Sequence, residues 1–425
     1  MTYPTAGARS LRLHRWSDLA VVGVAVAALL SGFGQFGVVA ALGNVARSFG
    51  HVVPGATLTD QAGLSGTRLG VGLAIIRLAS LGGLPLAGMA DRTGRRTTLV
   101  ITCGIGLALT AASAASPGYW WFVVIFALGR PLLSATNAIA QVDAAEQTGS
   151  PDRAKAVALV AAGYSFGAGV TVILHSLTGS ALGFRGLLLL ALVPLPVLPL
   201  VWRWTSEPSR FTVAAKATDR PLPVLGAVAA PYRSRLLAVC GLSFAIAVIT
   251  GPANSFVFLY AQNVLNVSGI ATAAMVVVAG ALGLGGLLLG RWLADHIGRR
   301  PACAIAMTGM AATGVLTYSG SLPGLFSGYT LGVLAAGTIA PAAGALANEL
   351  FPTPVRASVA GWLVAASVLG AVSGLLAFGA VADLGNRFGV AALAVFLPAL
   401  LGLAFFLVLP ETRGREPEDL WPEVA

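Results

Sequence analysis

The stretch Gly88-Met89-Ala90-Asp91-Arg92-Thr93-Gly94-Arg95-Arg96 ends a long apolar run in a short, strongly basic turn. Its second part returns as Asp295-His296-Ile297-Gly298-Arg299-Arg300, 204 residues later (295 − 91). In both copies an aspartate is followed, after two residues, by a glycine and two arginines. Self-similarity at a fixed offset is the sequence signature of an internal repeat. The two stretches therefore predict that the chain consists of two copies of one structural unit.

Two further charged motifs keep the same register. They are Glu146 and Arg153, which return as Glu349 and Arg356, and Glu207 and Arg210, which are echoed by Glu411 and Arg413. The offsets are 203 (349 − 146) and 204 (411 − 207). Charged clusters that recur in one register support a duplication that spans most of the chain.

The composition identifies lipid as the surrounding solvent. Hydrophobic residues make up 56% of the chain and charged residues 10%, with a mean hydropathy of +0.84, whereas about a quarter of a soluble domain is charged. A helix that crosses the bilayer needs about 20 apolar residues. Runs of this kind occur at 18–45, 68–88, 97–115, 118–142, 156–178, 184–203, 236–262, 271–291, 302–319, 323–347, 358–381 and 387–409.

Because backbone groups in lipid must bond within the segment, and because no run shows the alternation of a membrane barrel, these runs predict helices. The predicted fold class is an all-α membrane protein with twelve transmembrane helices in two six-helix halves. The predicted boundaries are an amino-terminal half at 1–204, a cytoplasmic linker at 205–235, a carboxy-terminal half at 236–410 and a cytoplasmic tail at 411–425.

The net charge of +10 is distributed in a way that argues against nucleic acid as a partner. With the amino terminus inside, only Arg47, Arg68, Arg185 and Arg387 of the basic residues fall in outer segments, and Arg77 and Arg130 fall within the membrane. The others lie on the cytoplasmic side. This positive-inside bias predicts a multi-pass protein of the cytoplasmic (inner) membrane with both termini in the cytoplasm. The basic start also resembles a signal peptide, but the apolar run that follows is longer than a typical signal core.

The sequence contains no pattern for a cofactor, a metal ion or an enzymatic reaction. Cys103, Cys240 and Cys303 all fall in apolar runs, where a cysteine acts as a small hydrophobic residue. No phosphate-binding loop or zinc-protease helix is present. We therefore expect neither a cofactor nor a metal site, and no enzyme activity.

These motifs resemble those of the major facilitator superfamily. Residues 88–96 and 295–300 are similar to its loop signature between helices 2 and 3 and between helices 8 and 9. Residues 349–356, 207–211 and 410–415 are similar to motifs of its sugar-porter and organic-ion-transporter branch. The resemblance covers about 31–420 and implies alternating access to a site between two halves that are related by an axis along the membrane normal.

We expect the charged loop residues to act as gates. Asp91 can pair with arginines or accept bonds from the positive end of a neighbouring helix, Gly94 permits the tight turn, and the Glu146–Arg153 and Glu349–Arg356 pairs can bridge helix ends. The candidate gating residues are Gly88, Asp91, Arg92, Gly94, Arg95, Arg96, Glu146, Arg153, Glu207, Arg210, Asp295, Gly298, Arg299, Arg300, Glu349, Arg356, Glu411 and Arg413. The alternative is that these are solvated charges that set topology, since exposed pairs contribute only about 0–1 kcal/mol.

Arg77 and Arg130 are candidate substrate-binding residues. Arg77 precedes Asp91 by 14 residues (91 − 77) and Arg130 precedes Glu146 by 16 (146 − 130), which places them roughly 21 and 24 Å from the cytoplasmic ends of their helices. A charge at this depth costs about 2.5–3.5 kcal/mol on insertion scales, so it should face a partner or a watery cavity. The functional interpretation is a cationic cavity for an anionic solute, and the alternative is an arginine bonded to helix carbonyls.

Further candidates are the polar residues Gln35, Asn137, Tyr164, Asn254 and Tyr260. Each is as well suited to bonding a neighbouring helix as to contacting substrate. The resemblance also has departures, because Gln35 follows Phe33-Gly34 where proton-coupled sugar porters carry an aspartate. No carboxylate lies in the middle of an apolar run, which argues against proton symport by a buried acid, and the amides that contact sugars in the branch are absent.

The sequence as a whole predicts a secondary or facilitated transporter of a small polar, anionic organic metabolite. The expected partners are that small molecule and the lipid bilayer, and we expect a monomer. The alternatives are a multidrug-type exporter of hydrophobic compounds, a sugar or polyol porter, and a receptor of the same fold that does not transport.

Overall fold

The structure is a computed structural model that describes residues 18–51, 61–148, 152–205, 228, 230–415 and 420–421. Every element that it describes is helical, as predicted. Most of the predicted linker at 205–235, including Glu207 and Arg210, lies outside the described residues. So do the side chains of Asp91 and Arg153.

The amino-terminal half consists of α1 (Leu19–Ala40), α2 (Leu42–Phe49), α4 (Gly66–Ala79), α5 (Gly83–Thr93), α6 (Arg95–Ala112), α7 (Tyr119–Gln147), α8 (Arg153–Leu189) and α9 (Leu198–Trp204). A 3-10 turn at Ser80–Gly82 joins α4 and α5 into one predicted span. Within α8 the chain turns at Gly183, whose φ of 59° suits glycine. The fifth and sixth predicted spans therefore lie on either side of this residue.

The carboxy-terminal half consists of α11 (Arg233–Ser255), α12 (Val257–Leu259), α13 (Gly269–His296), α14 (Arg299–Thr317), α15 (Leu322–Glu349), α16 (Thr353–Gly385) and α17 (Phe388–Ala399). A π turn at Tyr260–Val264 follows α12, and a 3-10 helix at Leu400–Leu407 follows α17. Several helices begin where a serine or aspartate precedes an apolar run. Ser65, for example, accepts the Arg68 N–H, and Ser268 accepts the Ala271 N–H.

Within the described part of the chain, eleven segments are long and apolar enough to cross a membrane. They match the predicted runs with the exception of 302–319, which corresponds to α14. This helix has 19 residues, but it opens with Arg299 and Arg300 and contains several threonines and glycines. It packs against α15 and α17, so a less apolar sequence is tolerated because part of its surface faces protein.

The duplication extends to helix packing. In the amino-terminal half α1 packs along α8, and in the carboxy-terminal half α11 packs along α16. A Cβ atom on Gly167 would lie 1.9 Å from the Leu29 carbonyl oxygen, and one on Gly374 would lie 2.4 Å from that of Val248. Both contacts bring backbone against backbone, which only glycine allows.

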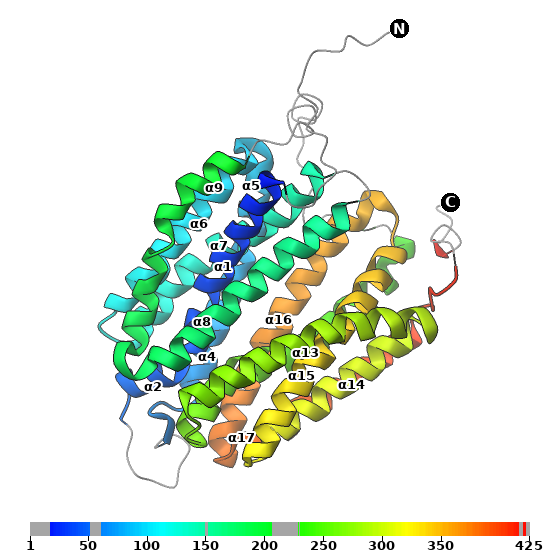
Figure 1. The fold of residues 1–425 in the computed structure, drawn as a ribbon. Coiled ribbons are helices and arrows are strands. Elements are labelled where there is room, and N and C mark those ends of the chain that lie inside the picture. Colours follow the sequence, from blue (N-terminus) through cyan, green and yellow to red (C-terminus); the bar gives the residue numbers. More distant parts are fainter. Residues whose placement is uncertain are drawn as a thin grey trace.

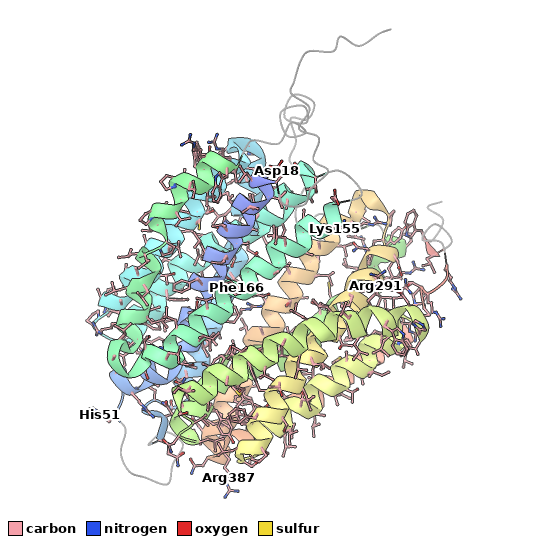
Figure 2. The ribbon with its side chains drawn as sticks, in the orientation of Figure 1. Asp18, His51, Lys155, Phe166, Arg291 and Arg387 are labelled. Atoms are coloured by element: carbon pink, nitrogen blue, oxygen red, sulfur yellow. The ribbon has the colours of Figure 1, made fainter. Side chains whose placement is uncertain are left out.

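The two halves meet near one end of the molecule and diverge toward the end where α1 begins and α13 ends (Figure 1). We call the latter the terminal face, marked by Asp18, Lys155 and Arg291, and the other the opposite face, marked by His51 and Arg387 (Figure 2). At the opposite face α4 packs on α16 and α8 packs on α13. The halves are therefore in contact at the opposite face and separated toward the terminal face.

Candidate functional site

A cavity of about 290 Å³ lies between the two halves. Its wall is built by α1, α4, α7 and α8 from the amino-terminal half and by α11 and α16 from the carboxy-terminal half. The predicted binding residues Gln35, Arg77, Arg130, Tyr164 and Asn254 all line it. Residues from both copies of the repeat thus meet in one space.

Arg130 is the most enclosed charge in the cavity wall. Arg130 lies on α7 and is 8% exposed, and its Nη1 donates to the backbone oxygen of Gln35 at 3.0 Å. Its Nε is buried and has no hydrogen-bond partner in the structure. Arg130 therefore joins α7 to α1 and still presents an unsatisfied N–H.

Arg77 lies in the last turn of α4, just before the 3-10 turn that interrupts this helix. Its Nε is likewise buried without a partner. Among the described residues, neither Arg77 nor Arg130 forms an ion pair with a carboxylate. Two uncompensated guanidinium groups beside one cavity favour an anion there, because leaving a buried charge unpaired is costly.

Gln35 connects the cavity to the interior of the amino-terminal half. Tyr164 donates to its Oε1 at 3.4 Å, its Nε2 donates to Ser31 at 2.8 Å, and Ser31 donates to the Leu133 backbone oxygen at 2.7 Å. The ring of Tyr164 also packs edge-on to Phe36, with centroids 6.2 Å apart. Gln35 thus bonds Tyr164 through its side chain and Arg130 through its backbone oxygen.

The carboxy-terminal half contributes the neutral side of the wall. Thr250, Asn254 and Ser255 line it from α11, and Ala371 and Leu375 line it from α16. The Asn254 side chain is exposed to the cavity, and its Nδ2 donates to the Thr250 oxygen at 3.0 Å. Asn254 also lines a smaller neighbouring cavity of about 40 Å³. One wall is therefore cationic and the other is polar but uncharged.

The structure places two predicted binding residues away from this cavity. Tyr260 is buried in an aromatic cluster with Tyr318 and Phe388, and its hydroxyl accepts the Gly320 N–H at 2.8 Å. Asn137 lies farther along α7 with its Oδ1 buried and unbonded. Neither residue belongs to the cavity lining, and Tyr260 instead bonds the turn before α15.

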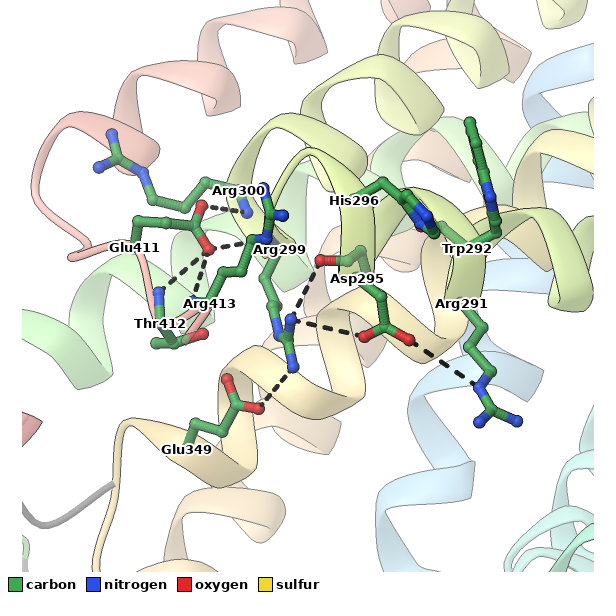
Figure 3. A network of polar contacts seen from close by, with 11 residues as sticks. Arg291, Trp292, Asp295, His296, Arg299, Arg300, Glu349, Glu411, Thr412 and Arg413 are labelled. Carbon is green, nitrogen blue, oxygen red and sulfur yellow. Dashed lines mark hydrogen bonds and ion pairs between the residues drawn. The ribbon is translucent and has the colours of Figure 1, made fainter. Parts of the chain in front are cut away.

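The repeated loop motifs form a repeated contact near the terminal face. In the amino-terminal half Arg95 forms an ion pair with Glu146, and in the carboxy-terminal half Arg299 pairs with Glu349 at 3.3 Å. Asp295 adds a second carboxylate 3.6 Å from Arg299 (Figure 3). Each contact joins the helix after the loop signature to the end of the next helix in the same half.

The partner of Glu349 differs from the predicted one. Arg356 donates from its Nε to the Phe351 backbone oxygen at 2.9 Å, whereas Glu349 bonds Arg299. The motif glycines have the expected role at the turn, because Gly94 has a φ of 100° and Gly298 a φ of 108°. Side chains of Arg92 and Arg413 are exposed, and Gly88 is half-buried within α5.

Glu411 caps the first turn of α14. Its carboxylate accepts the backbone N–H groups of Arg299 at 2.8 Å and Arg300 at 3.0 Å, and also those of Thr412 and Arg413 (Figure 3). Burial opposes ionisation of this group, but the four N–H donors outweigh it and hold the pKa of Glu411 below its usual value. In the other half, Arg96 donates to the Trp202 backbone oxygen at 2.7 Å and lies 4.1 Å from the centroid of its ring. Glu207, the counterpart of Glu411, lies outside the described residues.

The pKa of Glu411 is lower in the folded protein than its unfolded value of about 4.5, so the ionised carboxylate stabilises the folded state above that pH. This stabilisation is lost as the pH falls through the folded pKa. We therefore expect the melting temperature of detergent-purified protein to fall over this acidic window, and the fall to be smaller in Glu411→Gln. Asp152→Asn is the matched control, because Asp152 bonds the exposed Lys155 side chain instead. Equal acid sensitivity of wild type and Glu411→Gln would contradict this role.

Comparison with known proteins agrees with this architecture. The model of the family described as Major Facilitator Superfamily matches residues 24–314 and 286–423. Among solved structures, the inward-open xylose transporter XylE of Escherichia coli superposes with a TM-score of 0.70 at 18% identity, covering 94% of this chain and 98% of that one. At this identity the similarity concerns the fold.

Three bacterial relatives are transporters by name. A probable 4-methylmuconolactone transporter of Cupriavidus pinatubonensis is 26% identical, with 88% of each chain covered. A gallate transporter of Pseudomonas putida is 26% identical, covering 86% of this chain and 88% of that one. A 3-(3-hydroxy-phenyl)propionate transporter of Escherichia coli is 29% identical, covering 80% and 84%. With helices that suit a membrane and a family model that matches most of its length, the chain is a multi-pass membrane transporter and belongs to the Major Facilitator Superfamily.

Proposed function

We propose that the protein carries a small aromatic carboxylate across the cytoplasmic membrane by alternating access. The observation that carries this proposal is the pair of arginines, Arg77 and Arg130, that face one cavity between the halves and have no carboxylate partner among the described residues. A substrate carboxylate supplies the missing negative charge. Guanidinium groups suit this because they bind carboxylates with two parallel hydrogen bonds.

The named relatives support an aromatic acid as the cargo. Gallate and 3-(3-hydroxyphenyl)propionate, named for two of them, are aromatic carboxylates. The cavity also offers Phe36 and Tyr164 beside the arginines, so an aromatic ring finds aromatic neighbours. Its volume of about 290 Å³ is close to the lower end of the usual range of about 300–1,000 Å³ for ligand sites. A single-ring acid fits this description better than a large drug-like compound.

The charge pattern orients the molecule. The basic loop motifs gather at the terminal face, which the positive-inside rule assigns to the cytoplasm. With both termini inside, the separated halves open toward the cytoplasm and the molecule is in an inward-facing state. We propose that it works in this way as a monomer.

The cavity also bears on energy coupling. No carboxylate occurs among its described lining residues. We therefore favour uniport, exchange or coupling through the charge of the substrate itself over proton uptake by an acid in the cavity wall. A sugar or polyol would leave both guanidinium groups uncompensated, which argues against that alternative.

Ligand-dependent melting of the detergent-purified protein tests the proposal. Gallate, 3-(3-hydroxyphenyl)propionate, xylose and a lipophilic cation such as tetraphenylphosphonium are the probes. A ligand present at 100 times its dissociation constant stabilises the folded state by about 2.7 kcal/mol. We expect only the carboxylates to raise the melting temperature, and we expect Arg77→Ala to remove this effect.

Arg68→Ala is the matched control, because Arg68 belongs to the same helix but its exposed side chain is not part of the cavity lining. It should respond to carboxylates as wild type does. Stabilisation by xylose or tetraphenylphosphonium alone would overturn the assignment of an acidic substrate.

A further inference from the structure

A single carboxylate at the opposite face connects the two halves through three hydrogen bonds. Asp383, near the end of α16, accepts the Gly66 N–H on Oδ1 at 2.6 Å. Its Oδ2 accepts the Thr67 N–H at 2.8 Å and the Thr67 hydroxyl at 2.5 Å. The partners are separated by more than 300 positions in sequence and belong to different copies of the repeat.

Gly66 and Thr67 are the first two residues of α4. The N–H groups at a helix start have no partner within the helix, and the helix dipole makes that end positive. Ser65, in the same half, accepts the Arg68 N–H. Asp383, in the other half, accepts the N–H groups of Gly66 and Thr67. The start of α4 is therefore completed by the carboxy-terminal half, through charge-assisted hydrogen bonds of the strong kind.

Close backbone approaches form another part of this contact. A Cβ atom on Gly66 would lie 2.8 Å from the Gly379 oxygen, one on Gly379 2.3 Å from the Gly66 oxygen, and one on Gly70 2.5 Å from the Leu375 oxygen. Glycine at these positions lets the two helix backbones approach closely. The bonds of Asp383 are the charged, directional part of this contact.

The contact is also continuous with the cavity. Leu73 and Ile76 of α4 and Leu375 of α16 line the cavity and follow Gly66, Gly70 and Gly379 along the same two helices. Separation of α4 from α16 at Asp383 would thus open the cavity toward the opposite face. A smaller contact nearby, in which Asn263 donates to the Gly43 backbone oxygen at 3.2 Å, joins α2 to the π turn at Tyr260–Val264.

We propose that Asp383 is a latch that holds the opposite face closed by capping α4 of the other half, and that it must release for the cavity to open there. The release breaks three hydrogen bonds and leaves two helix N–H groups to water. The latch thus sets the balance between the two access states independently of which solute is carried.

Distances between spin labels test the latch in the absence of substrate. In a background in which Cys103, Cys240 and Cys303 are replaced by serine, one label pair at His51→Cys and Arg387→Cys reports on the opposite face (Figure 2). A second pair at Lys155→Cys and Arg291→Cys reports on the terminal face. All four positions are exposed.

Asp383→Asn is expected to lengthen the distance at the opposite face and shorten it at the terminal face. Because hydrogen bonds to charged groups are individually strong, we expect the ratio of the two populations to shift about tenfold, which corresponds to about 1.4 kcal/mol. Thr67→Val, which removes one of the three bonds, should shift the ratio in the same direction by less.

Ser65→Ala is the matched control, since it weakens the same helix start without touching Asp383. It should leave both distance distributions as in wild type. Unchanged distances in Asp383→Asn, or equal shifts in Ser65→Ala, would overturn the latch. If Asp383→Asn does not fold, an unchanged distribution in Thr67→Val has the same meaning. A failure of the carboxylate assignment leaves this test unaffected, because no ligand is added.

Discussion

Arg130→Ala is expected to lower counterflow of an aromatic carboxylate in proteoliposomes at least about 30-fold. Removing one partner of a buried, hydrogen-bonded charge pair costs about 2–5 kcal/mol, and each 1.4 kcal/mol is a factor of ten. Arg130 would form such a pair with a bound carboxylate, because it is 8% exposed and its buried Nε has no hydrogen-bond partner among the described residues. The measured quantity is the initial rate of labelled gallate uptake into liposomes preloaded with unlabelled gallate.

The same arginine also supports the fold, so the loss must be separated from unfolding. Arg130 donates to the Gln35 backbone oxygen, and alanine removes this charge-assisted hydrogen bond between α7 and α1 at a cost of about 1.5–3 kcal/mol. Arg130→Gln keeps a donor but removes the charge, and Arg130→Lys keeps the charge but loses the planar fork. We expect the glutamine variant to melt nearer wild type than alanine and still to lack counterflow. Normal counterflow in Arg130→Gln would show that the charge does not bind substrate.

Arg95→Ala is expected to reduce the free energy of unfolding by roughly 3 kcal/mol, since breaking a buried ion pair typically costs about 3–5 kcal/mol. Arg95 and Glu146 have side-chain exposures of 10% and 27%, so alanine leaves Glu146 partly enclosed without its counter-charge. The double variant Arg95→Met with Glu146→Leu should lose less than Arg95→Ala alone, because neither charge is then stranded. Denaturant unfolding in detergent measures each step.

The pair formed by Lys155 and Asp152 is the control for this cycle. It also lies near the terminal face, but Lys155 is 62% exposed, and such surface pairs contribute about 0–1 kcal/mol. Lys155→Ala should therefore have little effect. If Arg95→Ala is equally mild, the repeated arginine is a topology signal only.

The loop motifs allowed much of the architecture to be predicted, for a physical reason. Turns and helix ends at the membrane surface need particular residues, such as Gly94 and Gly298 at positive φ and Arg95 and Arg299 beside a glutamate. These requirements are local in sequence. The twelve apolar runs followed from length and composition. The sequence of α14 is less apolar than the others, because a helix that packs against protein does not need a uniformly apolar surface.

The cavity was predictable only in part, because membrane helices are apolar on most sides and do not reveal which side faces inward. Buried arginines were informative, since a charge within the membrane must face the bundle interior, a partner or a water-filled cavity. Asn254 and Tyr260 looked equivalent, yet the helix is altered between them by the end of α11 at Ser255 and the π turn that begins at Tyr260. This change of helical geometry takes Tyr260 out of the cavity wall.

The residues that sequence reasoning missed are those whose partners lie far away in the chain. Asp383 was visible only as an acid at the end of an apolar run, and its value as a cap depends on the position of α4. Ser31, which bonds both Gln35 and the Leu133 oxygen, is a common small residue in a membrane helix. No local pattern identifies either of them.

The ion pairs at the terminal face have a mechanical consequence. Arg95 with Glu146 and Arg299 with Glu349 each join helices of one half, so they stiffen that half without tying it to its neighbour. Two stiff bodies that turn about a central cavity behave as levers, and displacement along a lever grows with distance from the pivot. A sub-ångström adjustment where a carboxylate meets Arg77 and Arg130 is then magnified at the far ends of the helices. The rigidity of each arm would determine how much of a small binding event reaches the gates.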